Sequence, residues 1–367
     1  TLVPWPPLYK DGDRIAPRNS KDDVSKWGEI KLSEKPVHVA IAVGESIQNA
    51  LDDANADLTV ISIASGTFNE NLVVESSGVY LKGSMDEAAP TILMNEERFL
   101  LAIHVTQEAM GTVIENMTIG GFNGDSSQTE GYAQGVLIEG RDTKLRKCNA
   151  LWLADPVKVV EAEACIIEDN FIQMMGQAGE GTKSDLQFNG TGIGNLVCRY
   201  NSISRGWVNG AAGIEAKGLY GSMCLDIGFN KVFDCREAQI EIATVPESEA
   251  IDNGSTLDVV MTIHHNILYN TIQQMLWAIS GAWSWAGQGG PDDAIELKMF
   301  GPATAYVYNN TANRNAGEFI EHNNDAPTFC RNNISTAAYQ QEDYDFRGTI
   351  QPDVDFSLAF GNSKPEI

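Results

Sequence analysis

Apolar and polar residues alternate in short runs along this chain, and an asparagine keeps returning in the same apolar frame. The frame reads apolar-x-x-Asn-x-apolar, as in 114–119 and 167–172. The recurring asparagines are Asn116, Asn149 (a looser fit), Asn170, Asn201, Asn230, Asn266, Asn310 and Asn333, at intervals of 33, 21, 31, 29, 36, 44 and 23 residues. A unit that recurs with variable insertions predicts a stacked, quasi-one-dimensional architecture.

The asparagine has a physical reason to recur. A coil of β-structure turns a corner once per lap, and Asn tolerates left-handed backbone angles and bonds to its local backbone. Stacked corners would place one amide over the next, so that the amides hydrogen-bond along the stack. The shortest intervals, 21 and 23 residues, approximate one lap of three short strands. The alternative is a set of unrelated Asn turns in a β-sandwich, which does not need one corner residue eight times.

The beginning of the repeat region supports the same architecture. Apolar residues at 47, 50, 51 and 54 have helical spacing, and strands are expected over 58–63, 66–74 and 79–83. This succession resembles the opening of the pectate-lyase-like superfamily, over about 41–340. The resemblance implies an all-β fold: a single-stranded right-handed parallel β-helix with an N-terminal capping helix and an Asn ladder. It is specific for fold and not for activity, because the scaffold hosts lyases, hydrolases, esterases and adhesins.

The length of 367 residues would ordinarily suggest two or more domains. A solenoid escapes that limit because each coil contacts only its neighbours. We therefore expect an irregular N-terminal extension over 1–40, the parallel β-helix over 41–345, and a C-terminal tail or cap over 346–367. The extension either packs along the outside or makes an oligomer contact, in a dimer or a trimer.

Composition and charge limit the classes of binding partner that we expect for this chain. The formal net charge is −25, so nucleic acid and anionic membranes are poor partners. Such acidity is typical of a saline or extracellular setting or of bound divalent cations, although it also keeps a long solenoid dissolved. No run of 18 apolar residues occurs, so no membrane span is expected. We expect a secreted protein. The six cysteines show no CxxC spacing, and most of them are interpreted as small core residues.

A second recurring strand carries the candidate chemistry. Its copies are 135–139, 156–160, 213–217, 239–243 and 294–298. Strands alternate their faces with period two, and stacked coils are about 4.8 Å apart. If the isoleucines of these strands point inward, the outward side chains are Glu215, Lys217, Glu241, Glu296 and Lys298. Glu215 and Glu241 are then close neighbours, and Glu296 follows one or two coils later.

Carboxylates this close serve two chemistries. Glu215, Glu241 and Glu296 could hold Ca²⁺, or two of them could work as an acid and a base. Lys217 is the candidate base, and Arg236 could clamp a substrate carboxylate. Lysines outside this catalytic group, Lys158 and Lys298, are candidate substrate ligands. The alternative is a solvated row of weak surface ion pairs.

Aromatic residues suggest where a sugar would stack. The candidates are Trp277, Trp283 and Trp285 in a Gly-rich insertion, and Trp207 at the start of another loop. Indole offers an apolar face beside a polar edge, although such a loop could also form its own hydrophobic cluster. Asp292 and Asp293 end the insertion. His264 and His265 precede a ladder asparagine, where a structural role at the corner is favoured over catalysis.

Particular families of this fold match only in part. Pectin methylesterases place a Gln-Asp step where this chain has Ala154-Asp155, and a second Asp near Asp169 or Asn170. Alginate- and chondroitin-type lyases pair Lys and Arg with a Glu-bound Ca²⁺, which Glu215, Lys217 and Glu241 resemble, but Ala243 or Thr244 falls where the Arg is expected.

Three functions follow from the sequence. The first is a Ca²⁺-assisted lyase that cleaves a uronate polysaccharide by β-elimination. The second is a glycoside hydrolase that uses two of Glu215, Glu241, Glu296 and Asp293. The third is a non-catalytic carbohydrate-binding solenoid, such as a phage spike or an adhesin.

Overall fold

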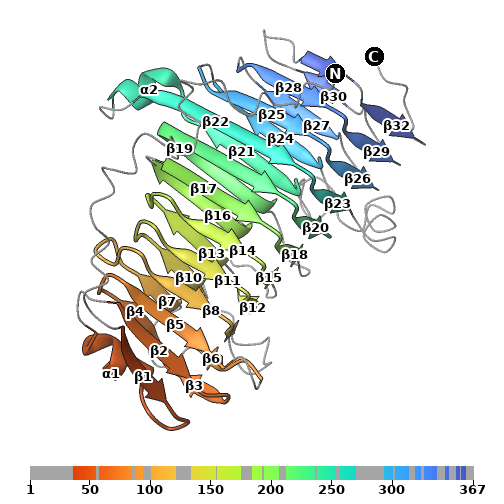
Figure 1. The fold of residues 1–367 in the computed structure, drawn as a ribbon. Coiled ribbons are helices and arrows are strands. Elements are labelled where there is room, and N and C mark those ends of the chain that lie inside the picture. The colour runs from red at the N-terminus through yellow and green to blue at the C-terminus, as the bar shows by residue number, and fades with distance from the viewer. Residues whose placement is uncertain are drawn as a thin grey trace, which may run out of the picture.

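The computed structural model shows a long solenoid of short parallel strands (Figure 1). It describes residues 36–54, 58–84, 88–93, 101–120, 134–153, 155–174, 184–191, 194–205, 212–235, 238–252, 256–269, 293–300, 302–313, 319–323, 326–336, 344–346, 353–355 and 357–360. Within this part of the chain, the strands of each coil pair in parallel with those of the coils before and after it. Crossovers between parallel strands are right-handed, and the right-handed parallel β-helix expected from the sequence is confirmed.

Three sheets run the length of the solenoid. Sheet A contains β1 (Val37–Ile41), β2 (Thr59–Ile63), β5 (Val79–Gly83), β8 (Val113–Glu115), β11 (Lys144–Arg146), β14 (Ile166–Glu168), β17 (Gly194–Arg199), the second half of β19 (Ala212–Gly228), β22 (Leu257–His264), β25 (Thr304–Tyr308), β28 (Thr328–Arg331) and β31 (Asp353–Asp355). Sheet B contains β3 (Thr67–Asn69), β6 (Thr91–Leu93), β9 (Thr118–Gly120), β12 (Asn149–Leu153), β15 (Phe171–Met174), β18 (Ser202–Arg205), β20 (Lys231–Phe233), β23 (Ile267–Tyr269), β26 (Thr311–Asn313), β29 (Ile334–Thr336) and β32 (Leu358–Phe360).

Sheet C contains β4 (Leu72–Val74), β7 (Leu101–Val105), β10 (Gln134–Ile138), β13 (Asp155–Val160), β16 (Ser184–Thr191), the first half of β19, β21 (Ile240–Thr244), β24 (Ile295–Lys298), β27 (Ile320–Asn323) and β30 (Tyr344–Phe346). A typical lap passes from sheet C to sheet A, turns the asparagine corner and continues in sheet B, as in β13, β14 and β15. Strand β19 spans sheets C and A without a break, and it pairs with β21 in the first and β22 in the second.

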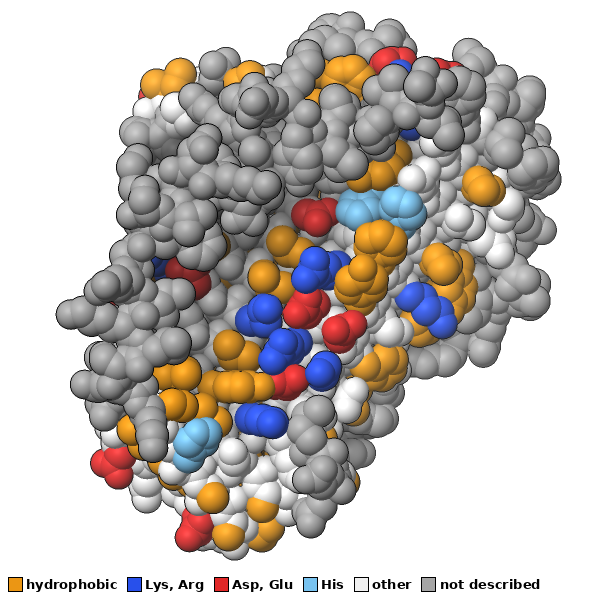
Figure 2. Space-filling model, viewed as in Figure 1, with side chains coloured by type: hydrophobic (Ala, Val, Ile, Leu, Met, Phe, Trp, Pro, Cys, Tyr) orange, Lys and Arg blue, Asp and Glu red, His pale blue; other side chains and the backbone are white. Residues whose placement is uncertain are grey.

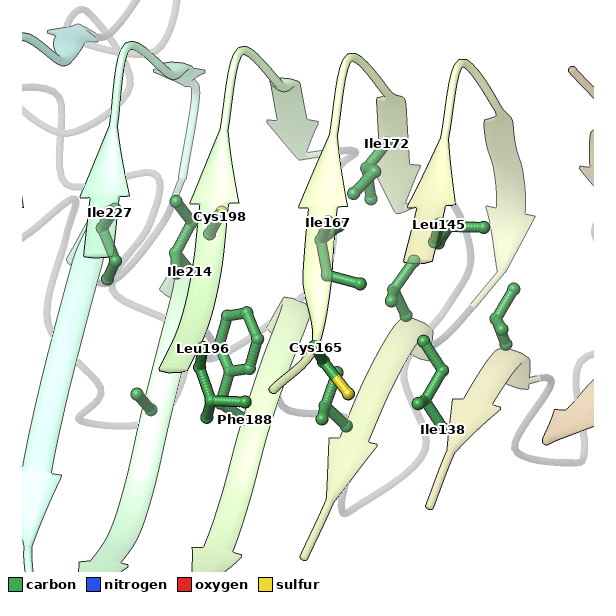
Figure 3. Packing of buried hydrophobic residues seen from close by; sticks show 14 of the residues in the cluster. Ile138, Leu145, Cys165, Ile167, Ile172, Phe188, Leu196, Cys198, Ile214 and Ile227 are labelled. Atoms are coloured by element: carbon green, nitrogen blue, oxygen red, sulfur yellow. The ribbon is translucent and has the colours of Figure 1, made fainter. Parts of the chain in front are cut away.

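The core lies inside the coil and consists of apolar side chains stacked from lap to lap. Figure 3 shows this stacking for Leu145, Ile167 and Cys198 on successive strands of sheet A. All three side chains are completely buried. Every second strand residue faces this narrow interior, and for that reason aliphatic residues recur with period two in the sequence.

The asparagine corner is built from two consecutive residues. The first has a left-handed backbone and is Asn116, Lys147, Asp169, Tyr200, Phe229, His265, Asn309 or Asn332. The second points inward and forms the ladder Asn170, Asn201, Asn230, Asn266, Asn310 and Asn333, joined by Nδ2–Oδ1 bonds of 3.0–3.1 Å. The ladder is confirmed, but the expectation that its asparagines adopt the left-handed angles is wrong.

Two asparagines assigned to the ladder from the sequence lie outside it. Asn116 occupies the left-handed position, and Asn149 begins β12. Cys148 takes the rung instead, and its backbone N donates to Asn170 Oδ1 at 2.9 Å. The apolar frame looks alike for a register shifted by one residue, so the pattern alone did not separate the two corner positions.

The N-terminal end of the core is covered by helix α1 (Ile47–Asp52), as expected. Ile47, Ala50 and Leu51 are its buried residues. The carboxylate of Glu70, from the following coil, accepts bonds from the Ile47 and Gln48 backbone N–H groups. These N–H groups have no partner within the helix, so Glu70 ties the cap to the first coil. A second helix, α2 (Glu247–Asp252), lies between β21 and β22.

The strand ladder extends past the domain boundaries expected at 41 and 345. At the start, β1 pairs with β2 over Val37–Ile41, and at the end β31 and β32 continue sheets A and B. The final strands are short and lack the asparagine frame, so their pattern was weak. In the described part of the chain, neither helix is long and apolar enough to cross a bilayer.

Candidate functional site

A row of acidic side chains follows sheet C from coil to coil. Glu215 on β19 pairs in register with Glu241 on β21, and Glu241 with Glu296 on β24. Glu296 is followed in register by Glu321 on β27 and then by Asp345 on β30. The adjacency expected for the first three residues is confirmed. We call these five residues the acidic row.

Two lysines join the carboxylates of the acidic row. Lys217 Nζ lies 3.2 Å from Glu215 Oε1 and 3.0 Å from Glu241 Oε2. Lys298 Nζ lies 3.0 Å from Glu241 Oε1 and 2.6 Å from Glu296 Oε1. Each oxygen of Glu241 therefore has its own ammonium partner.

The four glutamates of the row are largely withdrawn from solvent although they lie on the outer face of the coil. Glu215 and Glu241 are each 3% exposed and Glu321 is 7% exposed. The two lysine side chains remain 38% and 42% exposed. The ammonium groups therefore lie nearer to solvent than the carboxylates beneath them, which is not the arrangement of a solvated surface row.

Burial and charge change the proton affinity of this cluster. Burial raises the pKa of Glu296, and the charges of Glu241 and Glu321 raise it further, against the opposing effect of Lys298. Burial alone would lower the pKa of Lys217, but Glu215 and Glu241 outweigh it and hold that pKa above its ordinary value. The pKa of Lys298 is also raised, because Glu296 and Glu241 outweigh its burial. The site thus holds a carboxyl with a raised pKa beside two lysines whose pKa values are also raised.

The acidic row does not offer the ligands that a calcium ion needs. Calcium takes six to eight oxygen ligands, but Lys217 and Lys298 already bind oxygens of Glu215, Glu241 and Glu296. Among the described residues, no group of three or more His, Cys, Asp or Glu side chains is placed to hold a metal ion. The donor set with its lysines does not fit Ca²⁺, and calcium stays a prediction from the sequence.

Several candidate residues lie outside the described residues. They are Arg236, Asp292, Trp207, Trp277, Trp283 and Trp285. Lys158 on β13 lies in the same register row as Glu215, two coils earlier, with Gln187 between them. Asp293 is completely buried two residues before β24.

Sequence reasoning missed three members of this register row: Gln187, Glu321 and Asp345. Strand β27 reads Ile-Glu-His-Asn, and its Ile-Glu step repeats those of β19, β21 and β24. That dipeptide was the signal that could have found Glu321. The strands that carry Gln187 and Asp345 lack the step.

The two histidines lie at the corner between sheets A and B. His265 is a left-handed corner residue, and His264 ends β22. His264 Nε2 lies 2.8 Å from Asp226 Oδ1, and the Nδ1 atoms of the two rings are 2.9 Å apart. A Cβ on Gly228 would come within 2.4 Å of the His264 ring, so the ring packs closely on the preceding coil. These contacts agree with the structural role favoured from the sequence.

The residues that correspond to the catalytic pair of pectin methylesterases lie on different parts of the coil. Asp155 is buried on β13 in sheet C. Asp169 and Asn170 lie at the corner between sheets A and B, and Asn170 is part of the ladder.

The cysteines behave as expected: all six are free thiols, and burial raises the pKa of Cys148 to about 12.

Comparisons with known proteins give likenesses of fold at low identity. Neither a family model nor a curated protein matches the sequence. An alginate lyase from Paenibacillus sp. str. FPU-7 is 11% identical, with 85% of this chain and 99% of that chain covered and a TM-score of 0.42. Pectate lyase Pel9A is 11% identical, with 88% and 80% covered and a TM-score of 0.48. DFA-IIIase from Arthrobacter chlorophenolicus A6 is 12% identical, with 92% of both chains covered and a TM-score of 0.47. Identities this low say nothing about the reaction of this chain.

Proposed function

We propose that this protein is a secreted glycoside hydrolase that cleaves a polysaccharide along sheet C. Glu296 is the general acid and Glu321, one coil further on, is its carboxylate partner. The observation that carries the proposal is the raised pKa of Glu296 within an in-register row of carboxylates. A pair of carboxyl groups with different proton affinities is what glycosidic cleavage requires.

Glu296 and Glu321 together carry out both proton transfers and the nucleophilic attack. The Glu296 carboxyl gives its proton to the leaving glycosidic oxygen while the bond from that oxygen to the anomeric carbon breaks. The Glu321 carboxylate attacks the same carbon, and water, deprotonated by Glu296, later displaces Glu321. Adjacent coils are about 4.8 Å apart, which is nearer to the roughly 5–5.5 Å carboxyl separation of retaining enzymes than to the 6.5–9.5 Å of inverting ones. We therefore expect retention of the anomeric configuration.

Charge argues for Glu296 and against Lys217 as the proton-transfer group. A lysine base must be neutral, but Lys217 is held between two carboxylates that raise its pKa. β-Elimination with Lys217 as base and Ca²⁺ assistance is the function that the sequence favoured, and it is the alternative to this proposal; a non-catalytic carbohydrate-binding solenoid is the third. We also propose that the substrate is a polysaccharide and that the protein is secreted.

The test compares three variants of the full chain on a panel of neutral and anionic polysaccharides. Reducing ends and the ultraviolet absorbance of unsaturated uronates are both measured, with and without a chelator. Glu296→Gln should lower kcat by about 100-fold or more, because general acid catalysis contributes about 10²–10⁴-fold. Glu321→Gln should have a similar effect, whereas Glu249→Gln on α2, which is exposed, should have none.

Each outcome decides between the functions. Reducing ends without absorbance, unaffected by chelation and lost in Glu296→Gln, support the hydrolase. Absorbance that is lost with chelator would establish the calcium-dependent lyase instead. Turnover that survives Glu296→Gln, or no turnover on any polymer, would sink the proposal.

A further inference from the structure

A second charged cluster lies on sheet A, away from the acidic row. Glu115 and Glu168 occupy the same register row two coils apart, with Arg146 between them on β11. Arg199 follows Glu168 in register on β17. Figure 2 shows this face, where blue and red side chains alternate across the middle of the molecule.

The cluster is layered, with its cations outside. Arg146 Nη2 lies 2.9 Å and Lys147 Nζ 3.1 Å from Glu115 oxygens. Arg199 Nη2 lies 2.8 Å and Lys144 Nζ 3.6 Å from Glu168 oxygens. The Glu115 and Glu168 side chains are 4% and 11% exposed, but the four cationic side chains are 29–47% exposed. We call Lys144, Arg146, Lys147 and Arg199 the cationic ladder.

The buried carboxylates keep their charge and hold the cations in place. Burial would raise the pKa of Glu115, but hydrogen bonds from Tyr80, Lys147 and Arg146 lower it below its usual value. Burial would likewise raise the pKa of Glu168, and Arg199 and Lys144 lower it. Two buried negative charges anchor four positive ones, and the charge of Asp226 also acts on Arg199, so these seven groups carry an excess of one positive charge in a chain of net charge −25.

Exposed aromatic rings continue the same face. Tyr200 is 51% exposed and Phe229 is 43% exposed. Their rings stack at 5.1 Å, and the Arg199 guanidinium lies 5.9 Å from the Tyr200 ring centroid. Aromatic rings accept the apolar face of a sugar, and arginine binds carboxylate or sulfate through paired N–H groups. Arg199 and Tyr200 therefore offer an anion contact and a sugar-stacking contact on one coil.

We propose that the cationic ladder, with Tyr200 and Phe229 beside it, is a binding surface for a linear acidic polysaccharide. Lys144, Arg146 and Lys147 belong to one coil and Arg199 to the coil two steps further on, about 10 Å away at strand spacing, and a linear polymer that contacts both coils fits this spread better than a single small anion. The bound groups are carboxylates or sulfate esters on the sugar. This surface is separate from sheet C, so the inference does not depend on the proposed hydrolase.

The experiment measures binding of the full chain by affinity electrophoresis and calorimetry. The probes are alginate for carboxylates, dextran sulfate for sulfate esters, unmodified dextran, and oligothymidylate as a polyanion of another class. The wild-type protein should bind alginate or dextran sulfate, and whichever binds identifies the anionic group. Dextran should not bind, and added NaCl should weaken the complex, because surface charges are screened.

Matched variants locate the binding surface. Arg199→Gln should weaken binding by about three- to tenfold, as expected for one exposed ionic contact. Arg141→Gln removes the same charge from an exposed arginine outside the ladder and should change affinity by less than about twofold. Lys147→Asn suits the left-handed backbone at that corner and provides a second ladder variant if Arg199→Gln loses its native melting temperature.

Three results would overturn the inference. They are no binding of either acidic polymer, equal loss in Arg141→Gln and Arg199→Gln, and binding of oligothymidylate as tight as that of the acidic polysaccharides. Equally tight binding of oligothymidylate would mean that the surface attracts any polyanion by charge alone. Tyr200→Asn should weaken polysaccharide binding but leave any attraction for oligothymidylate unchanged.

Discussion

At the residue scale, the chemistry of sheet C depends on which neighbour each carboxylate has. Glu241 is held by two lysines, whereas Glu296 shares Lys298 and lies between Glu241 and Glu321 in register. The same residue type on adjacent coils therefore has different partners: two ammonium groups at Glu241, but one ammonium group and two neighbouring carboxyl groups at Glu296, the proposed proton donor. Lys298 is best described as a positioning residue, because it acts through the pKa of Glu296.

Replacing Lys298 with methionine should shift the pH profile of turnover. Lys298 lowers the pKa of Glu296, so its removal raises that pKa further. A general acid works while it is protonated, and activity is lost as pH rises through its pKa. The alkaline limb of kcat/KM should therefore move to higher pH in Lys298→Met. Lys231→Met, at an exposed lysine of β20 in sheet B, should leave the limb in place; an unmoved limb in both variants would contradict the assignment of Glu296.

At the scale of the element, the corner turns a local preference into a cooperative structure. Asn230 accepts bonds from the backbone N and Nδ2 of Asn201, and it donates to Cys198 O and Asn266 Oδ1. Every polar atom of its buried amide is thereby satisfied, which is the condition for keeping an amide inside an apolar coil. The left-handed residue that precedes it sets the bend, so two neighbouring positions divide the work of the corner.

Two asparagine variants test this division. Asn230→Ala leaves buried donors and acceptors of the adjacent rungs without partners, at a cost of about 3 kcal/mol or more. Asn149→Ala removes only a side chain that contacts Thr118 at 3.5 Å outside the ladder, and it should cost less than about 0.5 kcal/mol. Urea denaturation of both variants measures the difference. Equal loss of stability would mean that the ladder contributes nothing special.

At the scale of the whole molecule, the solenoid sorts charge by depth. The chain carries 50 acidic and 25 basic residues, yet exposed cations cover buried glutamates on sheet A and also on sheet C. Parallel, in-register stacking produces both, because it repeats one strand position on every coil. A net charge alone would have excluded any acidic partner from the entire surface, and the layered arrangement removes that exclusion locally.

The stacking also predicts how the molecule opens. Each coil contacts only its neighbours, so terminal coils have one partner and central coils have two. Amide hydrogen exchange should be slowest in β14, β17, β19 and β22, and fastest in β1 and β31 at the ends of sheet A. Uniform protection along sheet A would show instead that the solenoid unfolds as a single unit.

The sequence by itself determined the fold, the capping helix, the ladder from Asn170 to Asn333 and the outward face of Glu215, Glu241 and Glu296. It did so because period-two alternation and a recurring corner are local properties of the chain. Only the tertiary structure decided the left-handed position, the place of Glu321 in the row and the protonated state of Lys217. These depend on which coil lies above which, and insertions of variable length hide that register from the sequence. The cationic ladder was invisible for the same reason, since Glu115, Glu168 and Arg199, which join Lys144, Arg146 and Lys147 in the cluster, come from other coils.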